Sequence, residues 1–174
     1  MSSRVLPDRA VIRTARWGDK PFLEALSVEV FSRYTREPLR LLERMREHGT
    51  TLIAEHPLAG KPVPLGYVVI EVSGRHAATP HFREPRLAHL SAIAVKPEAM
   101  GCGLGRQLLE AAEDAAREQG AISMSLLTAS TNVIAQSLFR SAGYSPILPV
   151  DDAYRNEQDA IRMLKSLTLT PARG

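Results

Sequence analysis

The chain has 174 residues, of which 44% are hydrophobic and 24% are charged, and these proportions suit one globular domain with a substantial core. Its formal net charge of +3 is scattered among carboxylates, so no basic stripe indicates nucleic-acid binding. Cys102 is the single cysteine, which excludes an intrachain disulfide and a cysteine-rich metal site.

The N-terminal segment and the distribution of apolar residues indicate a cytoplasmic protein. The first residues, MSSRVLPDRA, lack the apolar stretch of a signal peptide, and no uninterrupted run of about eighteen apolar residues occurs. A single cysteine also fits a reducing compartment. We therefore predict a cytoplasmic location and no membrane partner.

A short strand and two helices are expected at the start of the chain. Residues 11–15 form a β-prone run, and Asp19 followed by Pro21 then opens a helix whose apolar residues recur at helical spacing. A second helix is expected to begin near Pro38 and to end at Gly49, which can adopt the left-handed conformation. Two helices therefore precede the main run of strands.

A hairpin and a loop are expected next. Residues 51–54 and 65–72 are β-branched or apolar, and the prolines and glycine of the intervening HPLAGKPVP favour a turn. Residues 73–85 contain turn-forming and basic residues without apolar periodicity, which predicts a loop over one end of the sheet. We interpret His76 and His81 within it as solvated side chains.

A buried strand, a glycine-rich turn and an amphipathic helix follow. Residues 86–95, RLAHLSAIAV, are apolar enough for the interior of a sheet, and Pro97 cannot donate to a strand ladder. Residues 104–120 place apolar side chains on one helical face. The opposite, solvated face is expected to carry Glu110, Glu113, Asp114, Arg117 and Glu118.

The last part of the chain predicts a strand, a helix and a strand. The strand covers residues 122–128, and Asn132 is placed to cap a helix that Gly143 ends. A final strand is expected over residues 160–164, followed by a frayed tail over residues 167–174. This order of elements indicates a single α/β layered domain in which helices flank a mixed central sheet.

The glycine-rich turn carries the strongest functional signal. The stretch IAVKPEAMGCGLGRQLLEA runs from the buried strand through Gly101, Gly103 and Gly105 into a helix N-terminus. Backbone N–H groups converge there, the helix dipole adds partial positive charge, and glycines let a diphosphate approach the main chain. The turn thus predicts a site for the pyrophosphate of a nucleotide or of coenzyme A. A tight turn without a ligand is the alternative, since short glycine motifs recur by chance.

Two other phosphate-binding motifs do not fit this turn. The dinucleotide-binding fingerprint requires a glycine at the position of Arg106. The phosphate loop of nucleoside triphosphatases requires Gly-Lys followed by Ser or Thr, whereas Gly105 is followed by Arg106 and Gln107. Both classes are therefore disfavoured.

Two motifs in the proper order resemble the GNAT superfamily of N-acetyltransferases. Residues 100–105, MGCGLG, match both glycines of its Q/R-x-x-G-x-G/A pattern. Residues 132–144, NVIAQSLFRSAGY, resemble its second motif, Asn-x-x-Ala followed by Leu-Tyr and Gly-Phe. The resemblance extends over about residues 10–165. It implies a mixed sheet whose splayed strands hold acetyl-CoA as cosubstrate, and no metal.

The resemblance also implies which residues bind acetyl-CoA. Main-chain groups of the buried strand, after a bulge, would bind the pantetheine arm and polarise the acetyl carbonyl, while the glycine turn would bind the pyrophosphate. Asn132 would contact the cofactor, cap its helix, or do both. The residues implied are Ile93, Ala94, Val95, Gly101, Cys102, Gly103, Leu104, Gly105, Arg106, Asn132 and Phe139.

Comparison with two subfamilies leaves two classes of acceptor open. The C-terminal YRNEQDAIRMLKSL resembles ribosomal-protein alanine N-acetyltransferases, which implies a peptide N-terminus as the acceptor. Their catalytic glutamate and tyrosine, however, align with Leu127 and Phe139. The strand AHLSAIAV instead resembles arylalkylamine N-acetyltransferases, which implies a small-molecule amine. Those enzymes use two histidines one residue apart, which align with His89 and Ser91.

His89 is the favoured general base. An acceptor ammonium with a pKa near ~10 is mostly protonated at neutral pH, so a base would raise the reactive fraction. Strand alternation places His89 and Ser91 on one face, opposite Ala88, Leu90 and Ala92, so that His89 and Ser91 could line one water path. A core histidine hydrogen-bonded to the backbone is the alternative.

The general acid and the activity itself stay open at this point. Tyr144 and Tyr154 are the candidates for the acid, because Phe139 has no proton to give. Loss of polar groups at Met100, Leu127 and Phe139 is also compatible with a non-catalytic acyl-CoA-binding or regulatory module. The chain is compatible with a homodimer.

Overall fold

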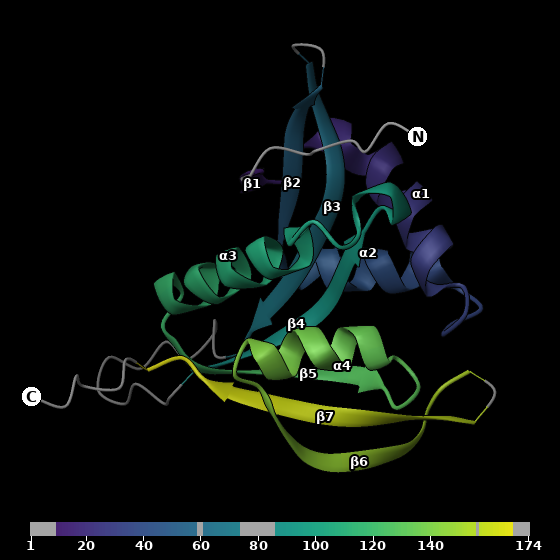
Figure 1. Cartoon of the computed structure of the whole chain (residues 1–174), viewed down its shortest axis with the longest axis vertical. Helices are drawn as coiled ribbons and strands as arrows, with labels where there is room; N and C mark the ends of the chain where they lie inside the picture. The colour runs from purple at the N-terminus through teal and green to yellow at the C-terminus, as the bar shows by residue number, and fades with distance from the viewer. Residues whose placement is uncertain (1–9, 59–60, 74–85, 156, 169–174) are drawn as a thin grey trace, which may run out of the picture.

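A seven-stranded mixed sheet organises the structure, a computed structural model that describes residues 10–58, 61–73, 86–155 and 157–168 (Figure 1). The strand order is β1-β2-β3-β4-β5-β7-β6, and only the neighbours β4 and β5 run parallel. The strands are β1 (Val11–Thr14), β2 (Thr50–Leu58), β3 (Lys61–Val72), β4 (Arg86–Val95), β5 (Ala121–Ala129), β6 (Ser145–Tyr154) and β7 (Gln158–Ser166). The mixed α/β sheet predicted from the sequence is therefore confirmed.

Helices cover both faces of this sheet. The α-helices are α1 (Lys20–Phe31), α2 (Pro38–His48), α3 (Leu104–Glu118) and α4 (Val133–Ser141), and single 3-10 turns precede α1 (Trp17–Asp19) and α3 (Pro97–Ala99). Helices α3 and α4 pack on one face through a core that includes Leu108 and Phe139. Helices α1 and α2 pack on the other face through Leu23, Leu26 and Leu42. The buried hydrophobic residues of β2, β3 and β4 belong to one core or the other.

The β2–β3 hairpin is longer than the sequence predicted. Residues 56–58 pair with residues 61–63, so most of the segment expected to form a turn lies in the ladder despite its prolines. The pairing of β1 with β2 ends at Glu55, and that of β4 with β3 ends at Gly66. Beyond these points no other described strand pairs with the hairpin, so a proline on its outer edges removes no ladder bond there.

Strand β6 was missed by the sequence analysis. It carries Pro146 and Pro149, which disfavour a central strand, but among the described strands it pairs only with β7 and forms the edge of the sheet. Proline is tolerated at such an edge because the strand has a second side with no partner to bond. Strand β7 is correspondingly longer than residues 160–164.

The predicted tail begins later than residue 167. Leu167 is buried in the α3/α4 core, its N–H donates to the carbonyl of Ile122, and its own carbonyl accepts from Arg117 Nε. The prediction was wrong here because β7 continues along β5 up to Ser166 and carries Leu167 into the core. Residues 169–174, and the predicted loop residues 74–85 with His76 and His81, lie outside the described residues.

Glu113 is buried, although the sequence placed it on the solvated face of α3. Its side chain accepts from Lys165 Nζ at 2.6 Å and from Arg117 at 3.4 Å, and the residue is only 3% exposed. Lys165 comes from β7, so a tertiary neighbour provides the charge partner that helical periodicity alone does not reveal. The buried carboxylate therefore ties α3 to β7.

We expect Lys165→Met to lower the free energy of unfolding by about 1–3 kcal/mol, because it leaves the Glu113 carboxylate buried with Arg117 as its remaining charge partner. Urea denaturation followed by circular dichroism measures the change. Arg40→Met, which removes the exposed Arg40–Glu37 ion pair, serves as the control and should leave the midpoint nearly unchanged. Equal midpoints for the two variants would show that the buried pair adds no stability.

Candidate functional site

The glycine turn before α3 has the geometry that an anion site requires. Gly101 and Gly103 both have φ of +77°, a conformation that disfavours side chains, and a Cβ added at either would meet no atom within 4 Å. Gly103 is the N-cap of α3, with no side-chain cap. Among the described residues, no acceptor binds the first-turn N–H groups of Leu104, Gly105 and Arg106. Open space in front of uncapped amides suits a phosphate group.

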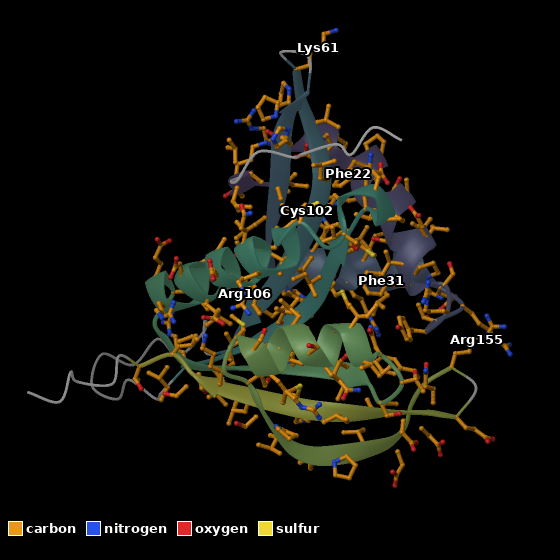
Figure 2. The ribbon with its side chains drawn as sticks, in the orientation of Figure 1. Phe22, Phe31, Lys61, Cys102, Arg106 and Arg155 are labelled. Atoms are coloured by element: carbon orange, nitrogen blue, oxygen red, sulfur yellow. The ribbon has the colours of Figure 1, made fainter. Side chains whose placement is uncertain are left out.

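The neighbouring residues of this turn have different roles. A Cβ at Gly105 would lie 3.3 Å from Leu138 Cδ2, so this glycine allows α4 to approach α3 closely. Arg106 donates to Ser141 Oγ at 2.5 Å, which holds its guanidinium against the end of α4. Cys102 is exposed, and Figure 2 shows it with Arg106 at the beginning of α3. The structure therefore assigns the anion-binding geometry to the main chain.

The parallel strands β4 and β5 separate beside this turn. Their pairing ends at Leu90 and Leu126, although β4 continues to Val95 and β5 to Ala129. Polar main-chain groups on the β5 side of β4 are thus left without a strand partner. This is the splayed arrangement that the resemblance implied.

The β3–β4 ladder determines which main-chain groups face the gap between β4 and β5. The N–H of Lys96 donates to the carbonyl of Leu65 at 2.8 Å. Because hydrogen-bonded pairs alternate along an antiparallel ladder, Ala94 directs its main-chain groups to Tyr67 of β3. Ile93 and Val95 direct theirs into the gap. Of the three residues expected to bind a pantetheine arm, these two are the ones placed to do so.

A β-bulge at Ser91 changes the facing of side chains along β4. Leu90 pairs with Ile70 and Ala92 with the adjacent Val69, so Ser91 has no partner in β3. Leu90 faces the α3/α4 core, whereas Ala92 faces the α1/α2 core. The predicted alternation, with Leu90 and Ala92 on one face, was therefore wrong beyond the bulge.

His89 lies just before the bulge in a polar cluster on the α1/α2 side of the sheet. Its Nδ1 is 3.1 Å from Ser125 Oγ of β5, and its cross-strand partner in β3 is Glu71. Glu71 also accepts a hydrogen bond from Ser91 Oγ at 2.5 Å. The cluster thus connects Ser91 with the partner of His89, and it adds two side chains, Glu71 and Ser125, that the sequence analysis did not name.

Burial lowers the pKa of His89 below its ordinary value of 6.5, because desolvation disfavours the charged imidazolium. The charge of Glu71 opposes this shift, and the charge of Arg162 on β7 adds to it. A histidine with a lowered pKa is mostly neutral at pH 7, which is the form that can accept a proton.

The two tyrosines considered as acids have different surroundings. Tyr144 is buried against Phe139, and its hydroxyl donates to Met124 Sδ at 3.1 Å. Burial and the charge of Glu113 raise the pKa of Tyr144 well above its usual range. Tyr144 therefore lies in the core on the α3/α4 side, opposite His89, and the structure does not bring the two together.

Tyr154 packs against Tyr34, which follows α1. Its hydroxyl donates to the carbonyl of Leu127, one residue beyond the last β4–β5 pair, at 3.2 Å. Burial raises the pKa of Tyr154 to about 12, which makes it a weak proton donor.

Asn132 and Phe139 are both engaged within the protein. Asn132 Oδ1 accepts from the N–H of Ala135 and so caps α4, as predicted, while its amide donates to Tyr34 Oη at 3.3 Å. Phe139 is 3% exposed and packs edge-on against the Tyr144 ring, with centroids 5.9 Å apart. Its burial leaves little surface for a cofactor.

Glu71 is one of the site residues that sequence reasoning missed. It lies at the end of an apolar strand, where the sequence pattern predicts a solvated side chain. Only the antiparallel register shows that it is opposite His89.

Within the described ranges no cluster of three or more His, Cys, Asp or Glu side chains could hold a metal ion. No helix in the same part of the chain is long and apolar enough to cross a membrane.

Comparisons with known proteins agree with this geometry. The family described as acetyltransferase (GNAT) family matches residues 13–144. The structure is similar to an IAA acetyltransferase from Bacillus cereus, with a TM-score of 0.71 and 17% identity over 91% of this chain and 99% of that one. A ribosomal-protein-alanine N-acetyltransferase from Brucella melitensis gives a TM-score of 0.68 and 22% identity over 90% and 99%. The putative acetyltransferase yncA from Salmonella typhimurium, described with its cofactor acetyl-CoA, gives 0.66 and 21% over 95% and 98%.

Proposed function

The chain belongs to the acetyltransferase (GNAT) family, and we propose that it is an acetyl-CoA-dependent N-acetyltransferase acting on a primary amine. The observation that carries this proposal is the uncapped N-terminus of α3, with its two positive-φ glycines, beside the gap where β4 and β5 separate. The amides of Leu104, Gly105 and Arg106 would hold the pyrophosphate. The main-chain groups of Ile93 and Val95 would hold the pantetheine arm.

The polar cluster on the α1/α2 side supports direct attack by the amine. Acetyl-CoA supplies the activated acetyl group as a thioester. The amine nitrogen forms the new C–N bond, the C–S bond breaks, and the nitrogen loses a proton. An N–H of the open β4 edge at Ile93 or Val95 would stabilise the developing oxyanion, an effect worth about 2.7–4 kcal/mol for one donor.

His89 would receive the proton from the amine at Nε2. Its Nδ1 faces Ser125 Oγ, and Ser125 Oγ in turn donates to the carbonyl of Ala88 at 3.5 Å. A hydroxyl that donates to a carbonyl accepts from Nδ1–H, which places the proton on Nδ1 and the lone pair on Nε2. Glu71 would stabilise the imidazolium that forms. The proposal assigns no acid side chain, because the thiolate can take its proton from water.

Release of free coenzyme A thiol tests the proposal. The protein is incubated with acetyl-CoA and a panel of small primary amines and short peptides, thiol is measured with a chromogenic disulfide, and the acetylated product is identified by mass spectrometry. We expect amine-dependent thiol release above the hydrolysis seen without protein. A folded protein that binds acetyl-CoA but releases no thiol with any amine would favour the non-catalytic acyl-CoA-binding module instead.

A further inference from the structure

A pocket of about 790 Å³ lies between three segments that are far apart in the sequence. Its walls come from the residues after α1, from the first turn of α4 and from the β6–β7 hairpin. The side chains that matter for its chemistry are Arg33, Tyr34, Val133, Ile134 and Arg155. This volume falls within the range of small-molecule sites.

Contacts between the three segments hold the pocket in shape. The N–H of Arg155 donates to the carbonyl of Tyr34 at 3.0 Å, and the Tyr34 and Tyr154 rings pack with centroids 5.2 Å apart. Asn132 donates to the hydroxyl of Tyr34, and Gln158 donates to Thr131 Oγ1. Each wall is therefore bonded to a neighbour, so the pocket is largely preformed.

The pocket lies next to the gap between β4 and β5. Tyr154, whose ring packs on the pocket residue Tyr34, donates to the carbonyl of Leu127 just past the last β4–β5 pair. Arg162 pairs with Leu127 in the β5–β7 ladder and is close enough to His89 to lower its pKa. The pocket side of β5 at Leu127 and the His89 contact at Ser125 are thus two residues apart on the same strand.

The two arginines of this pocket have no carboxylate partner among the described residues. In the described part of the chain, neither Arg33 nor Arg155 forms an ion pair or a side-chain hydrogen bond, and no acidic residue lines the pocket. Glu157 on the same hairpin forms no ion pair with either arginine. The arginines Arg13, Arg40 and Arg117, in contrast, each pair with a carboxylate. Figure 2 shows Arg155 projecting at the edge of the molecule, well away from Arg106 and the α3 turn.

We propose that this pocket binds an acceptor that carries an anionic group, a carboxylate or a phosphate, together with the amine to be acetylated. The inference rests on the proposed function and adds the class of substrate. Arg33 and Arg155 would hold the anion, since a guanidinium presents several donors in a planar fork that matches such groups. The side chains of Val133 and Ile134, 71% and 82% exposed, would cover the apolar part of the acceptor.

Matched acceptors test the proposal. Two tripeptides with the same N-terminal alanine are compared, Ala-Glu-Glu and Ala-Gln-Gln, both amidated at the C-terminus. Aspartic acid is compared with its diamide, which has the same α-amine but no carboxylate. The first pair represents a peptide source of the anion, and the second a small-molecule source. We expect kcat/KM to be about 10- to 100-fold higher for the acidic member of at least one pair.

The variant Arg155→Gln should remove most of this preference through KM. It should raise KM for the acidic acceptor far more than it changes kcat, and the affinity for acetyl-CoA is measured alongside. Lys61→Gln removes the same charge at the tip of the β2–β3 hairpin, at the opposite end of the molecule in Figure 2, and should change nothing. Raising the ionic strength should reduce the preference in wild type.

The outcomes distinguish this inference from the proposed function. Acetylation of neutral and acidic amines at equal rates would overturn the anionic acceptor while leaving the transferase activity intact. A loss of acetyl-CoA affinity in Arg155→Gln would place the arginine in the cofactor site and would also overturn the inference. Absence of acetylation with every amine would contradict the proposed function itself, and calorimetric titration of the acidic peptide into the complex with coenzyme A then still tests the pocket.

Discussion

Gly103→Asp is expected to abolish the rise in melting temperature that acetyl-CoA produces in the wild-type protein. A ligand present at 100 times its Kd stabilises the folded state by about 2.7 kcal/mol, which corresponds to roughly 5–11 °C for a domain of this size. An aspartate at this position would project into the open space before the amides of α3 and would put a negative charge beside a pyrophosphate. Both effects oppose binding.

The fold should survive this substitution. The φ of +77° at Gly103 disfavours a side chain, but aspartate tolerates this region better than most residues, and no neighbouring atom lies within 4 Å of the new Cβ. We expect the variant without ligand to melt within a few degrees of wild type. Differential scanning fluorimetry with and without acetyl-CoA measures both quantities.

Two controls separate charge from backbone strain. Gly103→Asn introduces the same strain without the charge and should retain part of the thermal shift. Gly120→Asp adds an aspartate at a glycine with φ of +84° beyond the opposite end of α3, where no anion is expected, and should retain all of it. A full acetyl-CoA shift in a folded Gly103→Asp protein would mean that the cofactor binds elsewhere.

The sequence predicted the glycine turn and α3 well because their signals are local. Positive φ at Gly101 and Gly103, the start of α3 at Leu104 and the cap formed by Asn132 each depend on residues within one or two turns. The turn is also the part of the chain with a family motif. Local chemistry and family resemblance therefore agree on the residues that the structure places before α3.

Features that depend on register or on partners could not be predicted in the same way. The bulge at Ser91 inverts the facing of every later residue in β4, yet it is defined only by the pairing with β3. Strand β6 contains two prolines that argue against a strand unless its position at the sheet edge is known. Helical periodicity alone assigns Glu113 to the solvated face of α3. Its contact with Lys165 depends on the position of β7 in the fold.

The same limit applies to the candidate active site. His89 could be singled out from one strand, but Glu71, Ser125 and Arg162 come from three other strands of the sheet. Their proximity to His89 results from a ladder that joins residues far apart in the chain. These neighbours are what make the role of His89 testable.

His89→Gln should lower turnover at pH 7 by roughly 10- to 1,000-fold, near or below the range usual for loss of a general base, because water can substitute in part. Glutamine preserves much of the side-chain volume and can hydrogen-bond to Ser125, but it cannot accept a proton. The affinity for acetyl-CoA should hold, because the glycine turn is untouched. Raising the pH should recover much of the rate, since more of the acceptor is then a neutral amine.

The pH dependence of kcat/KM in wild type gives a sharper test. A base acts in its unprotonated form, so the rate falls as the pH decreases through the pKa of His89. Burial lowers this pKa, which places the acidic limb below pH 6.5. A second limb from the acceptor amine, at higher pH, is expected in every variant and serves as an internal reference.

Substitution of the two charged neighbours should move the acidic limb in opposite directions. Glu71→Gln removes a negative charge that favours the imidazolium, so the pKa of His89 falls further and the limb moves to lower pH. Arg162→Gln removes a positive charge that disfavours it, and the limb moves to higher pH. Opposite shifts identify His89 as the titrating group, because a residue elsewhere would not respond to both charges in this way. If the limb stays in place in both variants and His89→Gln retains wild-type turnover at pH 7, His89 is a structural residue and the amine loses its proton directly to water.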